Sequence, residues 1–97
     1  MQLTFHIPGP LRDLTEGRSS VEIAASPRNL RDALDALWEL YPGVRYRILN
    51  EQGSVREHVN IFVGDESIRN TGGLDTPLNS DCEISIVPAV SGGIRGD

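Results

Sequence analysis

Two adjacent glycines near the end of the chain, Gly92 and Gly93, are the residues with the most evident chemical use. They follow a segment that alternates like a β-strand, and glycine adopts backbone conformations that other residues avoid. We expect Ser91, Gly92 and Gly93 to thread a narrow cleft of a partner protein and to place a glycine carboxyl group there. The dipeptide alone is weak evidence, because Gly72-Gly73 repeats it in what we interpret as a loop.

Cys82 is the single cysteine of the chain, so no internal disulfide can form. Its neighbours Asp81 and Glu83 are acidic and would raise the pKa of its thiol. We therefore expect a partly buried structural cysteine rather than a persulfide relay. His6 and His58 do not have the spacing from Cys82 that a metal site requires, so we predict no metal site.

Phe62 is a candidate partner contact. It lies in an alternating segment in which Val59, Ile61 and Val63 point to the opposite side. If a helix covers the face of those three residues, Phe62 lies on the open face of the sheet. Aromatic side chains on such faces often anchor partners. The sequence leaves open whether Phe62 does so.

The overall composition argues against several classes of function. The 97 residues suit one domain, and the net charge of −5 without a basic stripe disfavours nucleic-acid binding. No apolar stretch has membrane-spanning length and no signal peptide is visible, so we predict a cytoplasmic protein that does not bind a membrane. All nine basic residues are arginines. Because lysine is absent, no side-chain amine of this chain can accept an acyl group.

The domain that positions these residues contains several β-strands, which we predict from apolar residues that recur at every second position. A loop over 11–17 is expected to join the first two strands. The predicted strands cover residues 2–7, 18–24, 58–63 and 82–87, with a short edge strand over 66–69.

One amphipathic helix is predicted between the second and third strands. Ser26 is a suitable N-cap, and Pro27 suits the first helical position. The apolar stripe of the helix consists of Leu30, Leu34, Leu37, Trp38 and Tyr41. Tyr41-Pro42-Gly43 is expected to stop the helix. Residues 44–49 are ambiguous between a short helix and a strand.

The order of elements predicts an α+β fold with a mixed sheet of four to five strands and one main helix packed on one face. The first and last strands can pair in parallel through a right-handed crossover. We assign residues 1–90 to this domain and residues 91–97 to a flexible C-terminal tail.

Four parts of the chain also match a known pattern in order and spacing. They are LDAL and YPG within residues 34–43, HVNIFV at 58–63, GLDTPL at 73–78, and EISIVPAVSGG at 83–93. With these segments the chain resembles the MoaD/ThiS family of ubiquitin-like sulfur carriers, which includes the small subunit of molybdopterin synthase. The resemblance implies a β-grasp (ubiquitin-like) fold.

The resemblance also implies a mechanism in which Gly93 is the reacting residue. An adenylating enzyme of the ubiquitin-activating type uses ATP to convert the Gly93 carboxylate to an acyl adenylate. A sulfur donor then produces a thiocarboxylate, and a sulfur-accepting synthase takes the sulfur. The carrier is a co-substrate rather than an enzyme, needs no catalytic residue of its own, and holds no permanent cofactor.

The chain departs from the family pattern after Gly93, because it continues with Ile94-Arg95-Gly96-Asp97. An amide carbonyl at Gly93 cannot be adenylated as a carboxylate can. If the extension is native, a peptidase must first cut the Gly93–Ile94 bond, and the resemblance implies a JAMM-type metallopeptidase. A cloning remnant, or a family member that has lost sulfur chemistry, are the alternatives.

Two other functions remain open at this point. The chain could be a ubiquitin-like modifier joined through Gly93 to target lysines, for which the absence of lysine suits an acyl donor that must not modify itself. It could also be an interaction module without C-terminal chemistry. For a sulfur carrier, the sequence does not choose between molybdopterin, cysteine, thiamine, siderophore and transfer-RNA thiolation.

Overall fold

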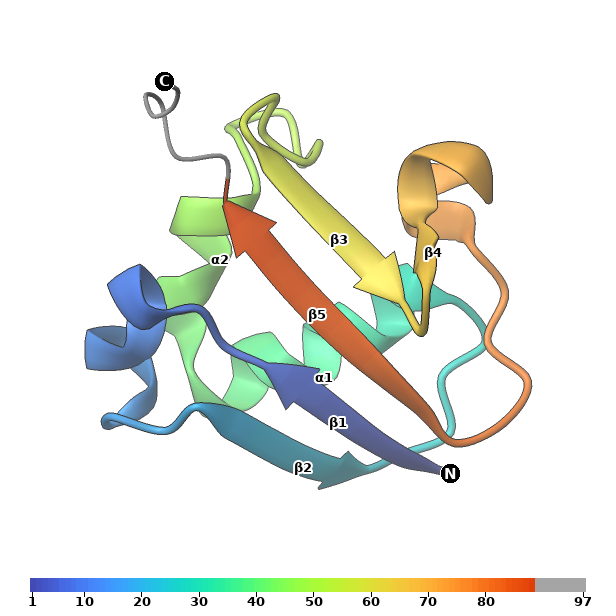
Figure 1. Ribbon diagram of the computed structural model, residues 1–97, viewed down its shortest axis with the longest axis horizontal. Helices are drawn as coiled ribbons and strands as arrows, with labels where there is room; N and C mark the ends of the chain where they lie inside the picture. Colours follow the sequence, from blue (N-terminus) through green and yellow to red (C-terminus); the bar gives the residue numbers. More distant parts are fainter. Residues whose placement is uncertain (89–97) are drawn as a thin grey trace.

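The fold is built on one mixed β-sheet, seen in the computed structural model, which describes residues 1–88 (Figure 1). The sheet has five strands in the order β2-β1-β5-β3-β4. The strands are β1 (Gln2–His6), β2 (Ser20–Ala24), β3 (Val59–Val63), β4 (Glu66–Ser67) and β5 (Cys82–Pro88). The predicted tail, residues 91–97, lies outside the described residues.

The strand pairing confirms the predicted mixed sheet. β1 pairs antiparallel with β2 and parallel with β5, while β3 pairs antiparallel with both β5 and β4. A parallel pair needs a long crossover connection, which the helices between the two strands supply. The first and last strands of the chain, β1 and β5, thus lie side by side, and β5 has a hydrogen-bonded neighbour on each side.

The main helix, α1 (Leu30–Leu40), starts later than predicted. Its N-cap is Asn29, whose side chain accepts a hydrogen bond from the Asp32 N–H at 3.0 Å. The prediction of Ser26 as N-cap with Pro27 at the first helical position is therefore wrong. Asp32 in turn accepts hydrogen bonds from the backbone and side chain of Arg28, which lower the pKa of its carboxyl group.

The ambiguous segment after α1 is a second helix, α2 (Pro42–Ile48). Tyr41 ends α1, and its N–H donates to the Leu37 carbonyl at 2.9 Å. Pro42 then occupies the start of α2, where the missing N–H of proline costs nothing. The Tyr41-Pro42-Gly43 motif does end α1 as predicted, but it also begins the next helix.

Short 3-10 helices account for most of the other differences. η1 (Gly9–Thr15) replaces the predicted loop, and the second strand begins at Ser20 rather than at residue 18. η2 (Ile68–Asn70) shortens the predicted edge strand to two residues, and η3 (Gly73–Asp75) follows it. A single turn of 3-10 helix leaves little periodicity for a sequence pattern to reveal.

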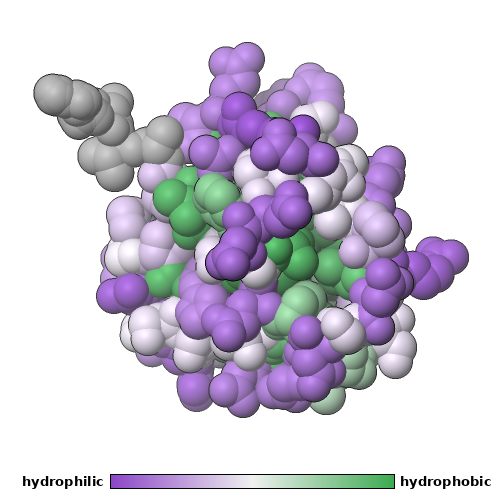
Figure 2. All heavy atoms as spheres, turned by 45° about the vertical axis from the view of Figure 1, so that its right-hand side comes forward, coloured by the Kyte–Doolittle hydropathy of each residue, from purple (hydrophilic) through white to green (hydrophobic). Residues whose placement is uncertain are grey.

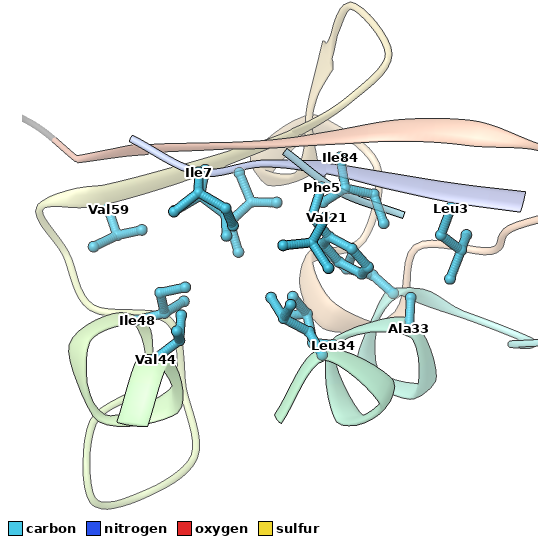
Figure 3. Packing of buried hydrophobic residues seen from close by; sticks show 14 of the residues in the cluster. Leu3, Phe5, Ile7, Val21, Ala33, Leu34, Val44, Ile48, Val59 and Ile84 are labelled. Carbon is cyan, nitrogen blue, oxygen red and sulfur yellow. The ribbon is translucent and has the colours of Figure 1, made fainter. Parts of the chain in front are cut away.

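The core lies between the sheet and the two α-helices, which cover one face of the sheet (Figure 1). Figure 3 shows the sheet residues Leu3, Phe5 and Ile84 pointing toward the helical layer, in which Leu34 of α1 and Val44 of α2 point back toward the sheet. All five residues are at most 1% exposed. Full burial of such a side chain stabilises the fold by roughly 1.5–3 kcal/mol. This packing confirms the predicted helix-on-sheet arrangement and leaves the other sheet face open.

The loop before β5 is tied to the start of α1. The Leu30 N–H donates to the Thr76 carbonyl at 2.9 Å, and the Leu78 N–H donates to the Arg28 carbonyl at 3.2 Å. Thr76 is buried, and its hydroxyl donates to the Gly73 carbonyl at 2.6 Å. These bonds satisfy backbone groups that would otherwise be orphaned at the helix terminus.

The cap assignment can be tested directly. We expect Asn29→Ala to lower the free energy of unfolding by about 1 kcal/mol, because the Asp32 N–H loses its acceptor. Ser26→Ala is the matched control, since Ser26 is exposed and makes no capping bond, and it should change the stability by less than about 0.5 kcal/mol. Urea unfolding of both variants measures this. Equal losses would contradict the assignment.

Candidate functional site

The chemistry predicted from the sequence depends on a tail that begins where β5 ends. Ser91, Gly92, Gly93 and Ile94 all lie outside the described residues, so their predicted roles stay predictions. The structure does place the base of the tail. Pro88, the last described residue, pairs with Val59 at the start of β3.

One row of side chains crosses the open sheet face through all five strands. It consists of Ser20, His6, Ser85, Phe62 and Ser67, which are register partners from strand to strand. Because side chains of paired residues point to the same face, this row lies opposite the helices. The alternation of β3 thus places Phe62 on the open face, as predicted.

Phe62 is half-buried within this row, and its partner contact is not tested by the structure. The next row toward the tail contains Val87 paired with Asn60. Val87 is 45% exposed, more than any other large apolar residue of the described strands. The Asn60 side-chain oxygen is buried and has no hydrogen-bond partner among the described residues.

Val87 and Asn60 were not identified from the sequence, although the same alternation contains them. Asn60 shares its side of β3 with Phe62, and Val87 is two residues beyond Ser85. What the sequence lacks is the register that brings Val87 and Asn60 together beside the tail base. Val87 and Phe62 supply the apolar part of this area, and the Asn60 side-chain oxygen is an acceptor in it that has no partner among the described residues.

Charged and polar side chains surround this area. His6 Nε2 lies 2.6 Å from Glu83 Oε1, and both side chains are substantially exposed. Figure 2 shows apolar areas separated by hydrophilic side chains on the side of the molecule that it presents. The open face therefore carries both apolar and polar side chains.

Cys82 lies at the other end of β5, away from the tail base. Its register partner is the buried Leu3, and a shallow depression beside it is lined by Asp65, Asp81 and Glu83. Burial and the Asp81 charge raise the pKa of the Cys82 thiol. The thiol is therefore protonated at neutral pH, which fits the predicted structural role better than a persulfide relay.

The part of the chain that the structure describes contains no cluster of three or more metal-ligating side chains. Within the same residues no helix is both long enough and apolar enough to cross a bilayer. Among these residues, His6, His58 and Cys82 belong to no such cluster. The described surface places Phe62, Asn60 and Val87 near Pro88, the last described residue.

Comparison with known proteins agrees with this arrangement. Residues 5–93 match the model of the ThiS family, a span that reaches the second glycine of the predicted tail. The sulfur carrier protein CysO of Mycobacterium tuberculosis (strain H37Rv) is 37% identical over 95 residues, which cover 96% of this chain and 100% of that protein. Small archaeal modifier protein 3 of Haloferax volcanii is 26% identical over 93 residues, which cover 96% of this chain and all of that protein.

A solved structure from another organism has the same fold as this chain. A chain in the crystal structure of the Amycolatopsis orientalis BexX/CysO complex superposes with a TM-score of 0.84 and 31% identity, covering 94% of this chain and 99% of that one. The predicted α+β, ubiquitin-like (β-grasp) fold is thereby confirmed. Sequence pattern, sheet topology and these similarities agree: the chain belongs to the ThiS family.

Proposed function

We propose that this protein is a sulfur carrier that delivers sulfur from a thiocarboxylate at Gly93. The observation that carries the proposal is the end-to-end similarity to the CysO sulfur carrier, together with a family match that extends through Gly93. In this proposal residues 1–90 form the body, residues 91–97 form the tail, and the protein works in the cytoplasm.

The chemistry takes place on the Gly93 carboxylate in a partner's active site. A carboxylate oxygen attacks the α-phosphorus of ATP, and pyrophosphate leaves. Hydrosulfide from a sulfur donor then attacks the acyl carbon of the adenylate. AMP leaves with the carboxyl oxygen that had attacked ATP, and a thiocarboxylate remains. AMP is a far better leaving group than the oxide ion of a carboxylate, which is why activation must precede sulfur transfer.

The body of the carrier has a binding role rather than a catalytic one in this scheme. The side chains near the tail base are those of Phe62, Val87 and Asn60, which suit contact with a partner better than proton transfer. The adenylating enzyme supplies the ATP site, and the sulfur-accepting synthase supplies the site of sulfur transfer. We propose Phe62 as a contact to the adenylating enzyme.

Activation also requires that Gly93 end the chain. Because Ile94 follows it in the sequence, a peptidase must hydrolyse the Gly93–Ile94 bond. We propose a JAMM-type metallopeptidase for this step. The similarity to CysO favours an acceptor on the route to cysteine over one on the route to molybdopterin.

A chain cut after Gly93 should take up sulfur. We expect residues 1–93, incubated with the adenylating enzyme of the same organism, ATP and sulfide, to gain the mass difference between sulfur and oxygen. Intact-mass spectrometry measures this. The uncut chain and a Gly93→Val variant of residues 1–93 serve as controls and should keep their mass, since the first has no free Gly93 carboxylate and the second places a branched side chain at the narrowest point. Lack of the shift in the cut wild-type chain would refute the sulfur-carrier function.

The contribution of Phe62 to partner binding can be measured separately from the reaction at Gly93. We expect Phe62→Ala to weaken binding to the adenylating enzyme by about 2 kcal/mol, because aromatic anchors carry much of the energy of an interface. The apparent KM for the carrier should rise while kcat stays constant, as measured by pyrophosphate release. Tyr46→Ala removes an aromatic side chain of α2 that is 68% exposed, so it is the matched control. A larger effect of Tyr46→Ala would place the contact on the helical side. Thermal melting checks that both variants remain folded.

A modifier function is the second candidate. It is favoured by the similarity to Small archaeal modifier protein 3 and by the absence of lysine from this chain. If it holds, immunoblots of cell lysate should show a ladder of larger species that contain this protein. The ladder should disappear with Gly93→Val and persist with Cys82→Ser, since an isopeptide bond does not involve the thiol. A single band at the size of the carrier would exclude this function under the conditions used.

A further inference from the structure

The outer side of β3, which faces away from β5, is covered by another strand along part of its length only. β4 pairs with Phe62 and Val63 at the C-terminal end of β3, and Figure 1 shows it beside that end. Within residues 1–88, Val59 and Ile61 have no strand neighbour on this side. The first residues of β3 therefore lie at an open edge of the sheet.

A pocket of about 470 Å³ lies beside this part of β3, on the side of the sheet that carries the helices. Residues of α1, η2, η3 and the loop before β3 form its other walls. We call it the β3 pocket. Its buried lining ends on the hydrophobic core, and two further apolar residues are partly buried. In that order, these apolar residues are Val59, Ile61, Ile68, Val55 and Leu74.

Arg69 of η2 places a fixed positive charge at the β3 pocket. Its Nη2 donates to the carbonyls of Glu57 and Val59 at 2.9 and 3.4 Å. The other two nitrogens of this guanidinium group make no hydrogen bond within residues 1–88, and no carboxylate in that range lies within ion-pairing distance. Arg31 of α1 also lines the pocket, and its Nη2 donates to Asp75 at 3.2 Å. The pocket thus joins an apolar surface to a guanidinium group with N–H donors that are still available.

These features select the chemistry of the ligand. A guanidinium group pairs well with a carboxylate, which accepts two parallel hydrogen bonds from it. The apolar lining suits an aliphatic or aromatic side chain. Arg31, Ser54, Glu57 and Arg69 are all exposed, so the pocket is open on one side. A metabolite is usually enclosed over most of its surface, whereas an open pocket suits a side chain that another protein presents.

The position of the β3 pocket relates it to the tail. Val59 lines the pocket and is the register partner of Pro88, the last described residue. Neighbouring strands lie about 4.8 Å apart, so the pocket begins one strand away from the tail base. Ile61 of the pocket also adjoins Phe62, whose side chain lies on the opposite face of β3. A protein that contacts Phe62 can therefore reach the pocket around the outer side of β3.

We propose that an acidic segment of the adenylating enzyme docks in the β3 pocket, with an apolar side chain against Ile61 and Leu74 and a carboxylate paired with Arg69. This inference rests on the proposed function, because it extends the proposed contact at Phe62 around the outer side of β3. The charge fits such a partner, since Arg69 has no carboxylate partner within residues 1–88 although the whole chain has a net charge of −5. The apolar contact provides affinity, and the Arg69 pair provides orientation.

A gain of binding tests the charge without disturbing the fold. Glu57 lines the pocket, is exposed, and has its carboxylate in no ion pair within residues 1–88, so it repels an acidic segment. In residues 1–93, we expect Glu57→Gln to lower the KM of the adenylating enzyme for the carrier roughly threefold with kcat unchanged, as measured by pyrophosphate release. Glu51→Gln makes the same change at an exposed turn outside the pocket and should match the wild type. An unchanged or higher KM for Glu57→Gln would overturn the proposal.

Losses of binding test the two contacts of the docked segment. Arg69→Glu should raise the KM about tenfold by charge repulsion, and Leu74→Ala should raise it about fivefold by removing apolar contact. Arg18→Glu repeats the charge change at an exposed arginine outside the pocket, and Leu14→Ala removes a partly buried leucine of η1. Both controls should keep the wild-type KM. Thermal melting checks the fold of each variant, and Glu57→Gln decides the question if Arg69→Glu unfolds by losing its two backbone bonds.

Hydrogen exchange locates the contact independently of the kinetics. When residues 1–93 bind the adenylating enzyme, exchange should slow over 53–58 and 68–75, which surround the pocket, and stay unchanged over 9–18. Equal exchange of the bound and free carrier over 53–58 and 68–75 would contradict the docking site. Without the enzyme, slower exchange of these segments in the uncut chain than in residues 1–93 would assign the pocket to residues 94–97 and overturn the proposal.

The remaining outcomes separate the two proposals. If the wild-type carrier is activated and every pocket variant matches its control, the pocket inference is wrong while the sulfur-carrier function stands. If the wild-type carrier is not activated at all, the function fails and the inference fails with it. Sedimentation that shows a wild-type dimer weakened by Arg69→Glu would assign the pocket to a second copy of this chain and overturn the proposal.

Discussion

β5 joins the two halves of the sheet, because it is hydrogen-bonded to β1 on one side and to β3 on the other. β5 pairs with β1 in parallel and with β3 antiparallel, and its inward residues Ile84 and Ile86 are buried against the helices. β5 is thus paired with β1 over residues 82–85 and with β3 over residues 84–88, so β3 holds its C-terminal end. Because the tail base is fixed, the position from which a partner receives the tail is fixed as well.

The body of the carrier has a well-packed interior, and its surface offers few reactive nucleophiles. The Cys82 thiol is protonated because burial and Asp81 raise its pKa, and it lies at the far end of β5 from the tail base. The absence of lysine removes the side-chain amines that an activated glycine could acylate. A protein that passes through an activated ester is best protected when its own surface offers no competing nucleophile. The partner enzymes then determine which reaction follows.

Much of the fold could be predicted from the sequence, because period-two alternation and the apolar stripe of α1 reflect burial on one face. The same alternation placed Phe62 on the open side. Local chemistry was less informative: both Ser26 and Asn29 are good N-caps, and the choice between them depends on the loop around Thr76, which bonds to the Leu30 N–H. The pairing of Val87 with Asn60 could not be found in this way, since it requires the register of two strands that are far apart in the sequence.

The central place of β5 has a mechanical consequence. A pull on the tail is transmitted along the axis of β5, and the hydrogen bonds to β1 and β3 lie across that axis. Such a load shears the bonds on both sides together instead of breaking them one after another. Resistance to forced unfolding depends on the height of the unfolding barrier rather than on equilibrium stability. A pull on the C-terminal end of β5 therefore meets resistance from the bonds to both neighbouring strands before the body unfolds.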